Sequence, residues 1–387
     1  MTEIAPFVFR LKTAVFFGEG AISQLPQICR EYRAAKILIL TDRGIRQSGL
    51  VDDMEKLLAT TGFSTVIFDE VESEPGLETV RRAAEFAGEQ GCGLVVALGG
   101  GSSIDTAKVL RVLVDYGGDP RDYAGVNKVP GELTVPLVAV PTTAGTGSEV
   151  SPAAVLSDWE RRAKIAVNSP HLAPGVALVD PRLTVSCPPP VTAASGMDAL
   201  GHAIEALVSN LAQPVTDALT LRAIGTIGSS LGRAVTDGHD IGARTGMALG
   251  SLLAGMAFAQ TRLGLAHSLA AVLGVQAHVN HGTAVGLFLS HVMEYNAVAR
   301  PEKFRAIAEA LGQRVESLNP EEAALVGARA VRRLQEDIGL PLRLRDVGVD
   351  EEVTDDLVRD VLGHVMINLN PRRPTAEDVI RLWRKAW

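Results

Sequence analysis

The first half of the chain alternates short apolar runs with stretches of helical periodicity, and no other feature of the sequence constrains the fold as strongly. Five runs of four or five residues are typical of buried strands: 36–40, 65–68, 94–98, 137–140 and 176–179. Apolar residues at helical spacing occupy 51–59, 77–87 and 103–114 between them. Strands that alternate with helices indicate βαβ units, and hence a parallel sheet covered by helices on both faces.

The composition of the sequence changes near Asp180-Pro181. The run Cys187–Pro190 contains three prolines and interrupts any regular element, and the residues beyond it are rich in Ala, Leu and Gly at helical spacing. The sequence therefore predicts a fold of the class α/β plus all-α. A parallel-sheet domain is expected over residues 1–182, and an all-helical domain over residues 183–387.

Charge and composition narrow the range of partners. The chain carries 37 Lys and Arg against 45 Asp and Glu, a net charge of −8. This balance argues against a nucleic-acid partner, because phosphate binding needs a basic surface.

Residues 263–293 hold no Asp, Glu, Lys or Arg and are long enough to cross a membrane, but their four histidines would be costly in lipid. We expect buried helices there and no membrane association.

The cysteines and the N-terminus bear on the cellular compartment. The three cysteines, at positions 29, 92 and 187, are odd in number and show no CxxC spacing. This pattern is typical of a reducing compartment rather than of a disulfide framework. The N-terminus lacks a basic start followed by an apolar run, which argues against a signal peptide. We therefore expect a cytoplasmic protein.

Two loops rich in glycine and hydroxyl groups follow strands of the predicted sheet. The first, residues 99–105, opens a helix whose N–H groups favour a phosphate, although a plain glycine-rich turn capped by Ser102 is the alternative. The second, residues 141–149, contains three threonines and could equally be a turn that satisfies its own backbone. Ligands of open α/β sheets bind at the carboxyl edge of the strands, so two such loops together indicate a ligand site.

Asp42 follows the strand at 36–40. A carboxylate at this place can accept hydrogen bonds from the ribose hydroxyls of NAD and repel the 2′-phosphate of NADP. The commoner role of such a residue is to end a strand or cap the following helix.

A third group of residues points to a metal ion. Asp198 and His202 are four residues apart, which places them on one face of a helix, and Asp198 is the only charged residue between positions 183 and 204. His267 and His281 add two imidazoles in the stretch without Lys, Arg, Asp or Glu. One carboxylate with three imidazoles suits Fe(II) or Zn(II), whereas any one of these histidines alone would more often be a hydrogen-bonded core residue.

Taken together and in this order, these segments resemble the iron-containing (group III) alcohol dehydrogenase family, most closely its lactaldehyde reductase/1,2-propanediol oxidoreductase branch. The similarity extends over essentially the whole chain, from Gly18-Glu19-Gly20 through both loops and residues 195–205 to the tail segments 370–374 and 385–387. It implies that residues 1–182 form a dinucleotide-binding domain and that residues 183–387 form a metal-binding, catalytic domain. It also implies NAD-linked interconversion of small primary alcohols or diols with aldehydes. A metal ion, Fe(II) or Zn(II), would polarise the substrate oxygen.

The resemblance also implies roles for individual residues. Phe258 would line the substrate pocket. Four residues would be the metal ligands: Asp198, His202, His267 and His281. In addition to Asp42, the NAD cofactor would be held by Gly99, Gly100, Gly101, Ser102, Asp105, Thr142, Thr143, Thr146 and Lys164.

Two positions depart from the family pattern. Ala271 stands where a second histidine often follows the ligand at 267, and Glu74 stands where Asn is often found. Because alanine cannot accept a proton, Ala271 removes one route by which the substrate hydroxyl could lose its proton. His278, three residues before His281, is then the nearest candidate for a general base in the sequence, although a histidine in such a loop more often only hydrogen-bonds within a turn.

Two alternative activities are known from proteins whose two-domain architecture is related to that of this family. One is a hydroxyacid–oxoacid transhydrogenase, and the other is a metal-dependent lyase similar to dehydroquinate synthase. Such a lyase would need a basic pocket for a phosphorylated acid, and the apolar stretch 263–293 argues against it.

The N-terminal segment suggests association between chains. Residues 7–17 alternate apolar and polar side chains and include four phenylalanines. A strand of this kind at the edge of a sheet would expose its apolar side chains unless another chain covered it. We therefore expect a homodimer or a larger homo-oligomer.

Overall fold

The computed structural model describes residues 6–387, which form two compact units. The sheet unit comprises residues 12–192 and 237–248, and the helical unit comprises residues 6–11, 193–236 and 249–387. The sheet unit thus continues ten residues beyond the domain boundary predicted at residue 182. That boundary itself stays a prediction.

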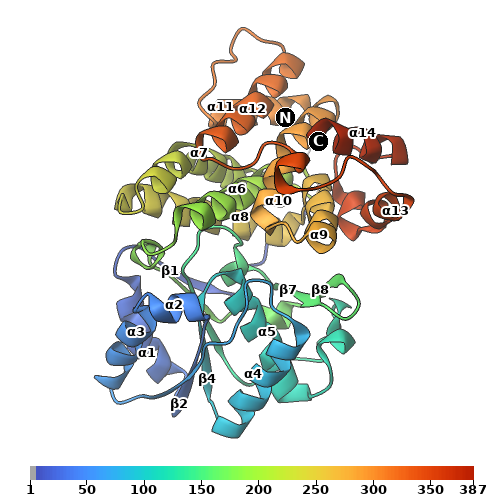
Figure 1. The fold of residues 1–387 in the computed structure, drawn as a ribbon. Helices are drawn as coiled ribbons and strands as arrows, with labels where there is room; N and C mark the ends of the chain where they lie inside the picture. Colours follow the sequence, from blue (N-terminus) through green and yellow to red (C-terminus); the bar gives the residue numbers. More distant parts are fainter. Residues whose placement is uncertain (1–5) are drawn as a thin grey trace. The chain divides into compact units, whose positions relative to one another are not determined.

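A six-stranded parallel sheet in the order β1-β9-β6-β4-β2-β3 forms the centre of the sheet unit (Figure 1). The five apolar runs of the sequence coincide with five of these strands to within one residue at either end, which confirms the α/β part of the predicted fold. The sixth strand, β1, covers only the last four residues of the N-terminal segment 7–17. The strands are β1 (Ala14–Phe17), β2 (Lys36–Leu40), β3 (Ser64–Phe68), β4 (Leu94–Gly99), β6 (Leu137–Pro141) and β9 (Val176–Val179).

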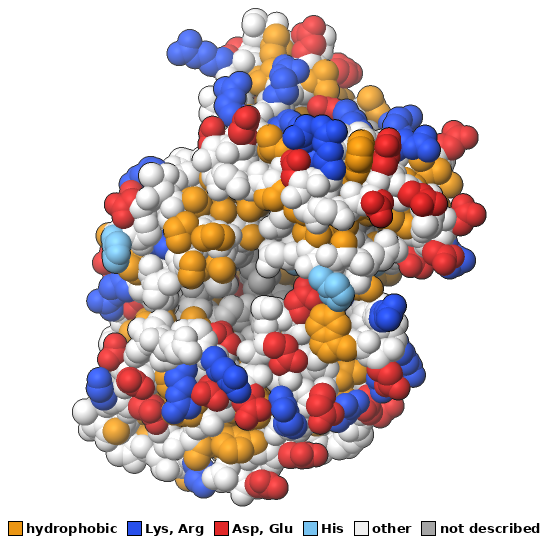
Figure 2. All heavy atoms as spheres, in the orientation of Figure 1, with side chains coloured by type: hydrophobic (Ala, Val, Ile, Leu, Met, Phe, Trp, Pro, Cys, Tyr) orange, Lys and Arg blue, Asp and Glu red, His pale blue; other side chains and the backbone are white. Residues whose placement is uncertain are grey.

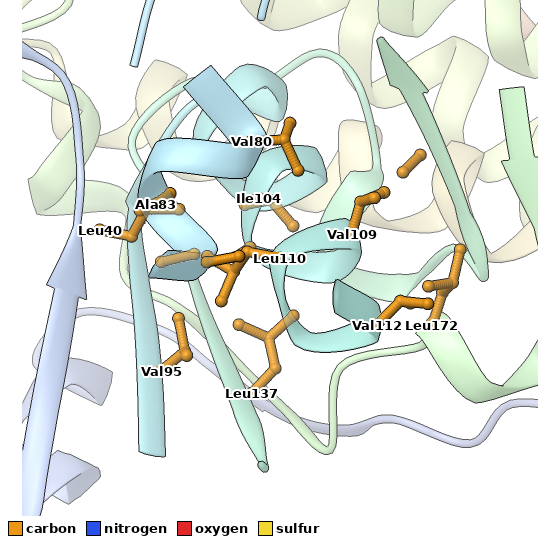
Figure 3. Packing of buried hydrophobic residues seen from close by; sticks show 14 of the residues in the cluster. Leu40, Val80, Ala83, Val95, Ile104, Val109, Leu110, Val112, Leu137 and Leu172 are labelled. Carbon is orange, nitrogen blue, oxygen red and sulfur yellow. The ribbon is translucent and has the colours of Figure 1, made fainter. Parts of the chain in front are cut away.

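Both faces of this sheet are buried, because successive side chains of a strand point to opposite faces. Leu38 and Leu40 of β2 belong to one apolar cluster, whereas Ile37 and Ile39 belong to another. Figure 3 shows the first cluster, in which Val95 and Leu137 of the sheet and residues of α4 and α5 pack together. The helices that lie wholly within this unit are α1 (Leu25–Glu31), α2 (Arg43–Gln47), α3 (Leu50–Ala59), α4 (Leu77–Gln90) and α5 (Gly101–Tyr116).

A small second sheet in the order β5-β8-β7 was not predicted from the sequence. Its strands are β5 (Gly125–Val126), β7 (Ala153–Asp158) and β8 (Ala163–Asn168), and β7 and β8 form an antiparallel hairpin. Charged residues in β7 and β8, and the length of only two residues for β5, hide these strands from a search for apolar runs.

The helical unit contains only helices and their connections among the residues that the structure describes, as predicted for the second half of the chain. The division between the units falls within α6, after Thr192, and within α8, after Ala248. The helices are α6 (Pro189–Val208), α7 (Pro214–Thr236), α8 (Ile241–Thr261), α9 (Leu265–Ala277), α10 (His281–Asn296), α11 (Pro301–Ala310), α12 (Pro320–Asp337), α13 (Asp355–Gly363) and α14 (Ala376–Ala386). The predicted class, α/β plus all-α, is confirmed.

Helix α8 is long and apolar enough to cross a membrane, yet 56% of its most apolar 18-residue segment is buried in the fold. Core helices of folded proteins can be equally long and apolar. The uncharged stretch 263–293 forms α9 and most of α10, which have 13 and 16 residues.

Figure 2 shows Lys and Arg side chains interspersed with Asp and Glu over the face in view.

Candidate metal centre and cofactor loops

Three helices of the helical unit bring one carboxylate and three imidazoles together. Asp198 and His202 lie one turn apart on α6, His267 lies in the first turn of α9, and His281 is the first residue of α10. The Nε2 atoms of the three histidines lie 3.6, 3.4 and 3.6 Å from Asp198 Oδ1, in chain order. The four residues predicted to be metal ligands therefore form one cluster.

Two glycines allow α6 and α10 to approach closely enough for this cluster. A Cβ on Gly282 would lie 2.1 Å from the carbonyl oxygen of Ala194, and a Cβ on Gly201 would lie 2.6 Å from Cγ1 of Val285. Both distances are far shorter than van der Waals contact, so a larger residue at either position would push the two helices apart. The close approach holds His281, next to Gly282, beside the carboxylate on α6.

The buried atoms of the cluster suit a divalent cation. Asp198 Oδ1 and His267 Nε2 are buried, and neither has a hydrogen-bond partner among the described residues. At 3.4 Å they are too far apart for a good hydrogen bond with each other. One ligand atom each from Asp198, His267 and His281 lies within 4.8 Å of the other two. Because a buried carboxylate is costly without a cation, and Fe(II) and Zn(II) accept such a donor set, the residues fit the predicted metal ion.

The charges within the cluster support this assignment. Burial alone would raise the pKa of Asp198, but the three imidazoles, led by His202, hold that pKa well below its usual range. Burial lowers the pKa of His267, whereas the neighbouring Asp198 and Glu205 carboxylates raise it to about 9. Protonated imidazole thus supplies the positive charge that the buried carboxylates require. A metal ion that bound here would displace these protons.

Glu205 belongs to this cluster and was not predicted from the sequence. Its Oε2 lies 2.7 Å from Nδ1 of His267, and the backbone N–H groups of Gly264 and Ala266 donate to its two oxygens at 2.9 and 2.7 Å. A signal was present, since Glu205 follows Asp198 by seven residues and so lies on the same face of an otherwise apolar helix.

The residues predicted to act on the substrate have different surroundings. The ring of Phe258 lies beside the cluster, 4.5 Å from the ring of His202 between centroids. His278 is exposed and ends α9 in the left-handed conformation, with φ of 53°. The structure thus makes His278 the C-terminal cap of this helix, and its role as a general base stays a prediction. Ala271, one turn beyond His267 on α9, offers no proton acceptor.

The two predicted cofactor loops of the sheet unit contact each other. They follow β4 and β6, which pair in parallel, and the N–H of Thr142 donates to the carbonyl of Gly99 at 3.0 Å. A Cβ on Gly101 would lie 2.7 Å from Cγ2 of Thr146. The close approach of the second loop therefore requires glycine at position 101.

Helix α5 begins at the first loop with no side chain capping its N-terminus. Its N-cap residue is Gly100, which lies close to Thr143. Ser102 Oγ donates instead to the carbonyl of Ser73 at 2.5 Å, so the alternative in which Ser102 caps this helix is wrong. Backbone N–H groups at a helix start of this kind bind phosphate groups, which supports the predicted pyrophosphate site.

Asp105 takes part in a buried network behind the loops. Its carboxylate accepts hydrogen bonds from Ser148 Oγ at 2.5 Å and from the N–H of Val155 at 2.8 Å, and it lies 3.3 Å from Nζ of Lys108. Lys108 is fully buried and also donates to the carbonyl of Ala153 at 2.6 Å. The network fixes α5 to the second loop. Direct contact between Asp105 and the cofactor stays a prediction.

Asp42 is a helix cap and also lies near the first loop. Its Oδ1 accepts a hydrogen bond from the N–H of Ile45 at 3.0 Å, at the start of α2. A Cβ on Gly99 would lie 3.7 Å from the other oxygen, Oδ2. Capping and the predicted ribose contact are compatible because they use different oxygens.

Lys164, on β8, is held by neighbours within the sheet unit. Its Nζ lies 2.7 Å from Ser157 Oγ and 3.1 Å from an oxygen of Glu74. Glu74, the second departure from the family pattern, therefore forms an ion pair with the lysine predicted to contact the cofactor ribose.

A parallel sheet with an uncapped helix start at its glycine-rich loop, and a helical unit with one carboxylate and three imidazoles, are typical of a dinucleotide- and metal-dependent enzyme. The family model described as iron-containing alcohol dehydrogenase matches residues 12–181, and that of the C-terminal part of the Fe-containing alcohol dehydrogenase family matches residues 192–387. The chain belongs to the iron-containing alcohol dehydrogenase family.

Relatives of known activity match nearly the whole chain. The 1,3-propanediol dehydrogenase of Citrobacter freundii is 39% identical over 383 residues, 98% of this chain and 99% of that protein. The lactaldehyde reductase of Escherichia coli K12 is 37% identical over 382 residues, 97% and 98% of the two chains.

Solved structures agree with the fold. A crystal structure of 1,3-propanediol oxidoreductase superimposes with a TM-score of 0.96 at 38% identity, covering 99% of this chain and 100% of that one. Sulfoacetaldehyde reductase from Bifidobacterium kashiwanohense, solved in complex with NAD+, gives a TM-score of 0.89 at 28% identity, with 99% of each chain covered. The family, the class of enzyme and the cofactors predicted from the sequence are confirmed at this level. The roles of individual site residues stay predictions.

Proposed function

We propose that this enzyme interconverts small primary alcohols or diols with the corresponding aldehydes, using NAD(H) and a metal ion held by Asp198, His202, His267 and His281. The observation that carries the proposal is the buried Asp198 Oδ1, which three imidazole Nε2 atoms approach within 3.4 to 3.6 Å. When bound, Fe(II) or Zn(II) supplies Lewis acidity toward the substrate oxygen, and NAD(H) accepts or supplies hydride.

The residues of the cluster would hold the metal ion and set its charge. One carboxylate and three neutral imidazoles would leave a divalent cation with a net positive charge, which would attract the electron-rich oxygen of the substrate. The Phe258 ring beside His202 would form an apolar wall for the carbon chain of a small alcohol.

The loops of the sheet unit would hold the cofactor. The start of α5, with Gly99 to Ser102, would bind the pyrophosphate, and Thr142, Thr143 and Thr146 would line the nicotinamide side. Asp42 Oδ2 and Lys164 would contact the ribose groups. Support comes from the packing of the two loops on each other and from the N-terminus of α5.

Proton transfer is assigned to His278 or to solvent. His278 is exposed to water at the end of α9, and Ala271 leaves no acceptor on the next turn after His267. A fall in kcat of roughly 10²- to 10⁴-fold in His278→Ala would identify His278 as the base. A fall of only a few-fold would assign the step to water.

We also propose that the enzyme is a cytoplasmic homodimer. All three cysteines are free, as suits a reducing compartment. β1 is at one end of the six-stranded sheet, and Phe16 and Phe17 are more than one third exposed there. Contact with the same strand of a second chain would cover these rings.

A substrate panel tests the proposed activity. The chelator-treated enzyme is reconstituted with Fe(II) or Zn(II) in parallel and assayed with NAD(H) against ethanol, 1,2-propanediol, 1,3-propanediol and their aldehydes. Metal-dependent NADH formation or consumption with at least one pair is the expected result. A protein that binds both metal and NADH but turns over no alcohol or aldehyde would contradict the proposal.

A further inference from the structure

Glu205 is not itself a predicted ligand, yet it contacts the candidate metal centre directly through His267. It lies on α6, three residues after His202, and its side chain is fully enclosed. Its carboxylate accepts hydrogen bonds from Nδ1–H of His267 at 2.7 Å and from the N–H groups of Gly264 and Ala266 at 2.9 and 2.7 Å. Both carboxylate oxygens are therefore engaged by the start of α9.

This carboxylate replaces the missing N-terminal cap of α9. The N-cap residue of that helix is Gly264, which has no side chain to accept hydrogen bonds from the first turn. Asn370 Oδ1 accepts from the N–H of Leu265 at 3.2 Å, and Glu205 accepts from the residues on either side. A Cβ on Gly264 would lie 2.8 Å from Asn370 Oδ1 and 3.1 Å from Glu205 Oε1. Glycine at 264 thus makes room for caps that come from distant parts of the chain.

The same carboxylate sets the orientation and the tautomer of His267. A carboxylate can only accept, so the proton of the neutral imidazole lies on Nδ1, and the lone pair lies on Nε2. That Nε2 is buried, has no hydrogen-bond partner among the described residues, and lies 3.4 Å from Asp198 Oδ1. The hydrogen bond to Glu205 therefore holds the ring with Nε2 facing the other predicted ligands, and it keeps the proton on Nδ1 when a metal ion displaces the proton of Nε2.

We infer that Glu205 is a positioning residue of the metal centre. It fixes the first turn of α9, and it keeps the proton of His267 on Nδ1 so that Nε2 faces the other predicted ligands. The inference rests on the proposed metal site. Carboxylates that orient ligand histidines typically contribute 10- to 100-fold to metal affinity. A carboxylate that only capped a helix would contribute to folding stability and leave the affinity unchanged.

Glu205→Gln separates these roles, because glutamine keeps the size of the side chain but loses its charge and can donate to Nδ1. The matched control is Asp378→Asn. Asp378 is also a buried carboxylate of the helical unit, and it accepts hydrogen bonds from the N–H of Thr375 at 3.0 Å, at the start of α14, and from the hydroxyl of Tyr295 at 3.0 Å.

Zn(II) affinity is measured on metal-free protein by chelator competition, together with the Tm of the metal-free protein and the visible spectrum after Co(II) loading. We expect Glu205→Gln to bind Zn(II) roughly 10- to 100-fold more weakly than wild type and to change the Co(II) spectrum. Asp378→Asn should lower Tm while Zn(II) affinity and the Co(II) spectrum stay as in wild type. If Glu205→Gln does not fold, the comparison is made with Glu205→Asp, whose shorter carboxylate keeps the charge but not the reach.

Zn(II) affinity within twofold of wild type in the Glu205 variant, with a lowered Tm, would overturn the inference and leave Glu205 a helix cap. Wild-type protein that fails to bind one equivalent of Zn(II) would overturn the proposed metal site as well, so the two failures are distinguishable.

Discussion

At the scale of single residues, two buried histidines of the helical unit have opposite electrostatic environments. Burial lowers the pKa of His267, but two carboxylates outweigh it and raise the pKa to about 9. His291, on α10, is also buried, and its Nε2 lies 3.3 Å from Nη1 of Arg332 on α12. Burial, together with the charges of Arg332 and of Lys385 on α14, lowers the pKa of His291 to about 4 against a weaker opposite effect of Glu294. His291 is therefore neutral in the folded protein at neutral pH.

The pKa of His291 predicts a loss of stability in weak acid. Between pH 6.5 and about 4 the unfolded chain binds a proton at His291 that the folded chain does not, so the free energy of unfolding falls as the pH falls through this window. At about 1.4 kcal/mol per pKa unit, the full contribution is roughly 3 to 4 kcal/mol. Urea unfolding at pH 7 and pH 4.5 should show a smaller pH dependence in His291→Gln than in wild type. The control is His239→Gln, which replaces an exposed histidine and should keep the pH dependence of wild type. Equal pH dependence in His291→Gln and wild type would contradict this account.

Asp42 predicts the cofactor preference. Its Oδ2 faces the first loop and would meet the 2′-phosphate of NADP with a negative charge, which corresponds to roughly 1 to 3 kcal/mol of discrimination. Asp42→Asn keeps a good N-cap for α2 but removes the charge, so kcat/KM for NADP should rise on the order of tenfold relative to NAD without loss of stability. Equal kcat/KM for the two cofactors in the unmutated enzyme would refute the assignment.

Residue types and spacing indicated a metal site, because Asp198 and His202 share a helix face and further histidines lie in an uncharged stretch. The choice of His267 and His281 among the four histidines of that stretch came from the resemblance to the family. The partners of these residues were not predictable. Glu205 reaches a backbone turn 59 residues further along the chain, and Asp105 turns toward Lys108 and the second loop. Contacts of this kind depend on how helices pack, which no local pattern records.

At the scale of elements, strands that are buried on both faces were predicted to within a residue. β2 and β4 are continuous apolar runs, and few other structures accommodate such runs between helices. β5, β7 and β8 were missed because they are short or mix polar with apolar residues. Strand β1 is shorter than the alternating segment 7–17 suggests: only residues 14–17 pair with the sheet, and residues 6–13 do not.

The contact between α10 and α6 predicts the effect of a single methyl group. Gly282→Ala would place a Cβ 2.1 Å from the carbonyl oxygen of Ala194, so α10 must move and take His281 away from Asp198. We expect a loss of roughly 1 to 3 kcal/mol in the free energy of unfolding, and a lower Zn(II) affinity. Gly232→Ala on α7 is the control: apart from the backbone of its own helix, nothing lies within 4 Å of a Cβ there, and alanine should stabilise the helix by up to about 1 kcal/mol. Wild-type Zn(II) affinity in Gly282→Ala would show that this contact does not position His281.

At the scale of the whole molecule, the edge strand β1 predicts association. Light scattering at micromolar concentration should give about twice the 40.9 kDa of one chain, or a higher multiple. Phe17→Asp, which places a charge on the exposed edge, should shift the mass toward one chain, whereas Val298→Asp, at an exposed apolar position of the helical unit, should not. A monomeric mass for the unmutated protein would count against the dimer.

The central claim is that turnover requires a metal ion at the cluster of Asp198, His202, His267 and His281. The most direct test measures metal content and NADH formation on the same anaerobic preparations of wild type and His281→Ala, stripped by chelator and titrated with Fe(II) or Zn(II). The account predicts no turnover in stripped wild type, recovery to a plateau at one equivalent of metal, and lower metal content and activity together in His281→Ala. Full activity of metal-free His281→Ala would contradict it.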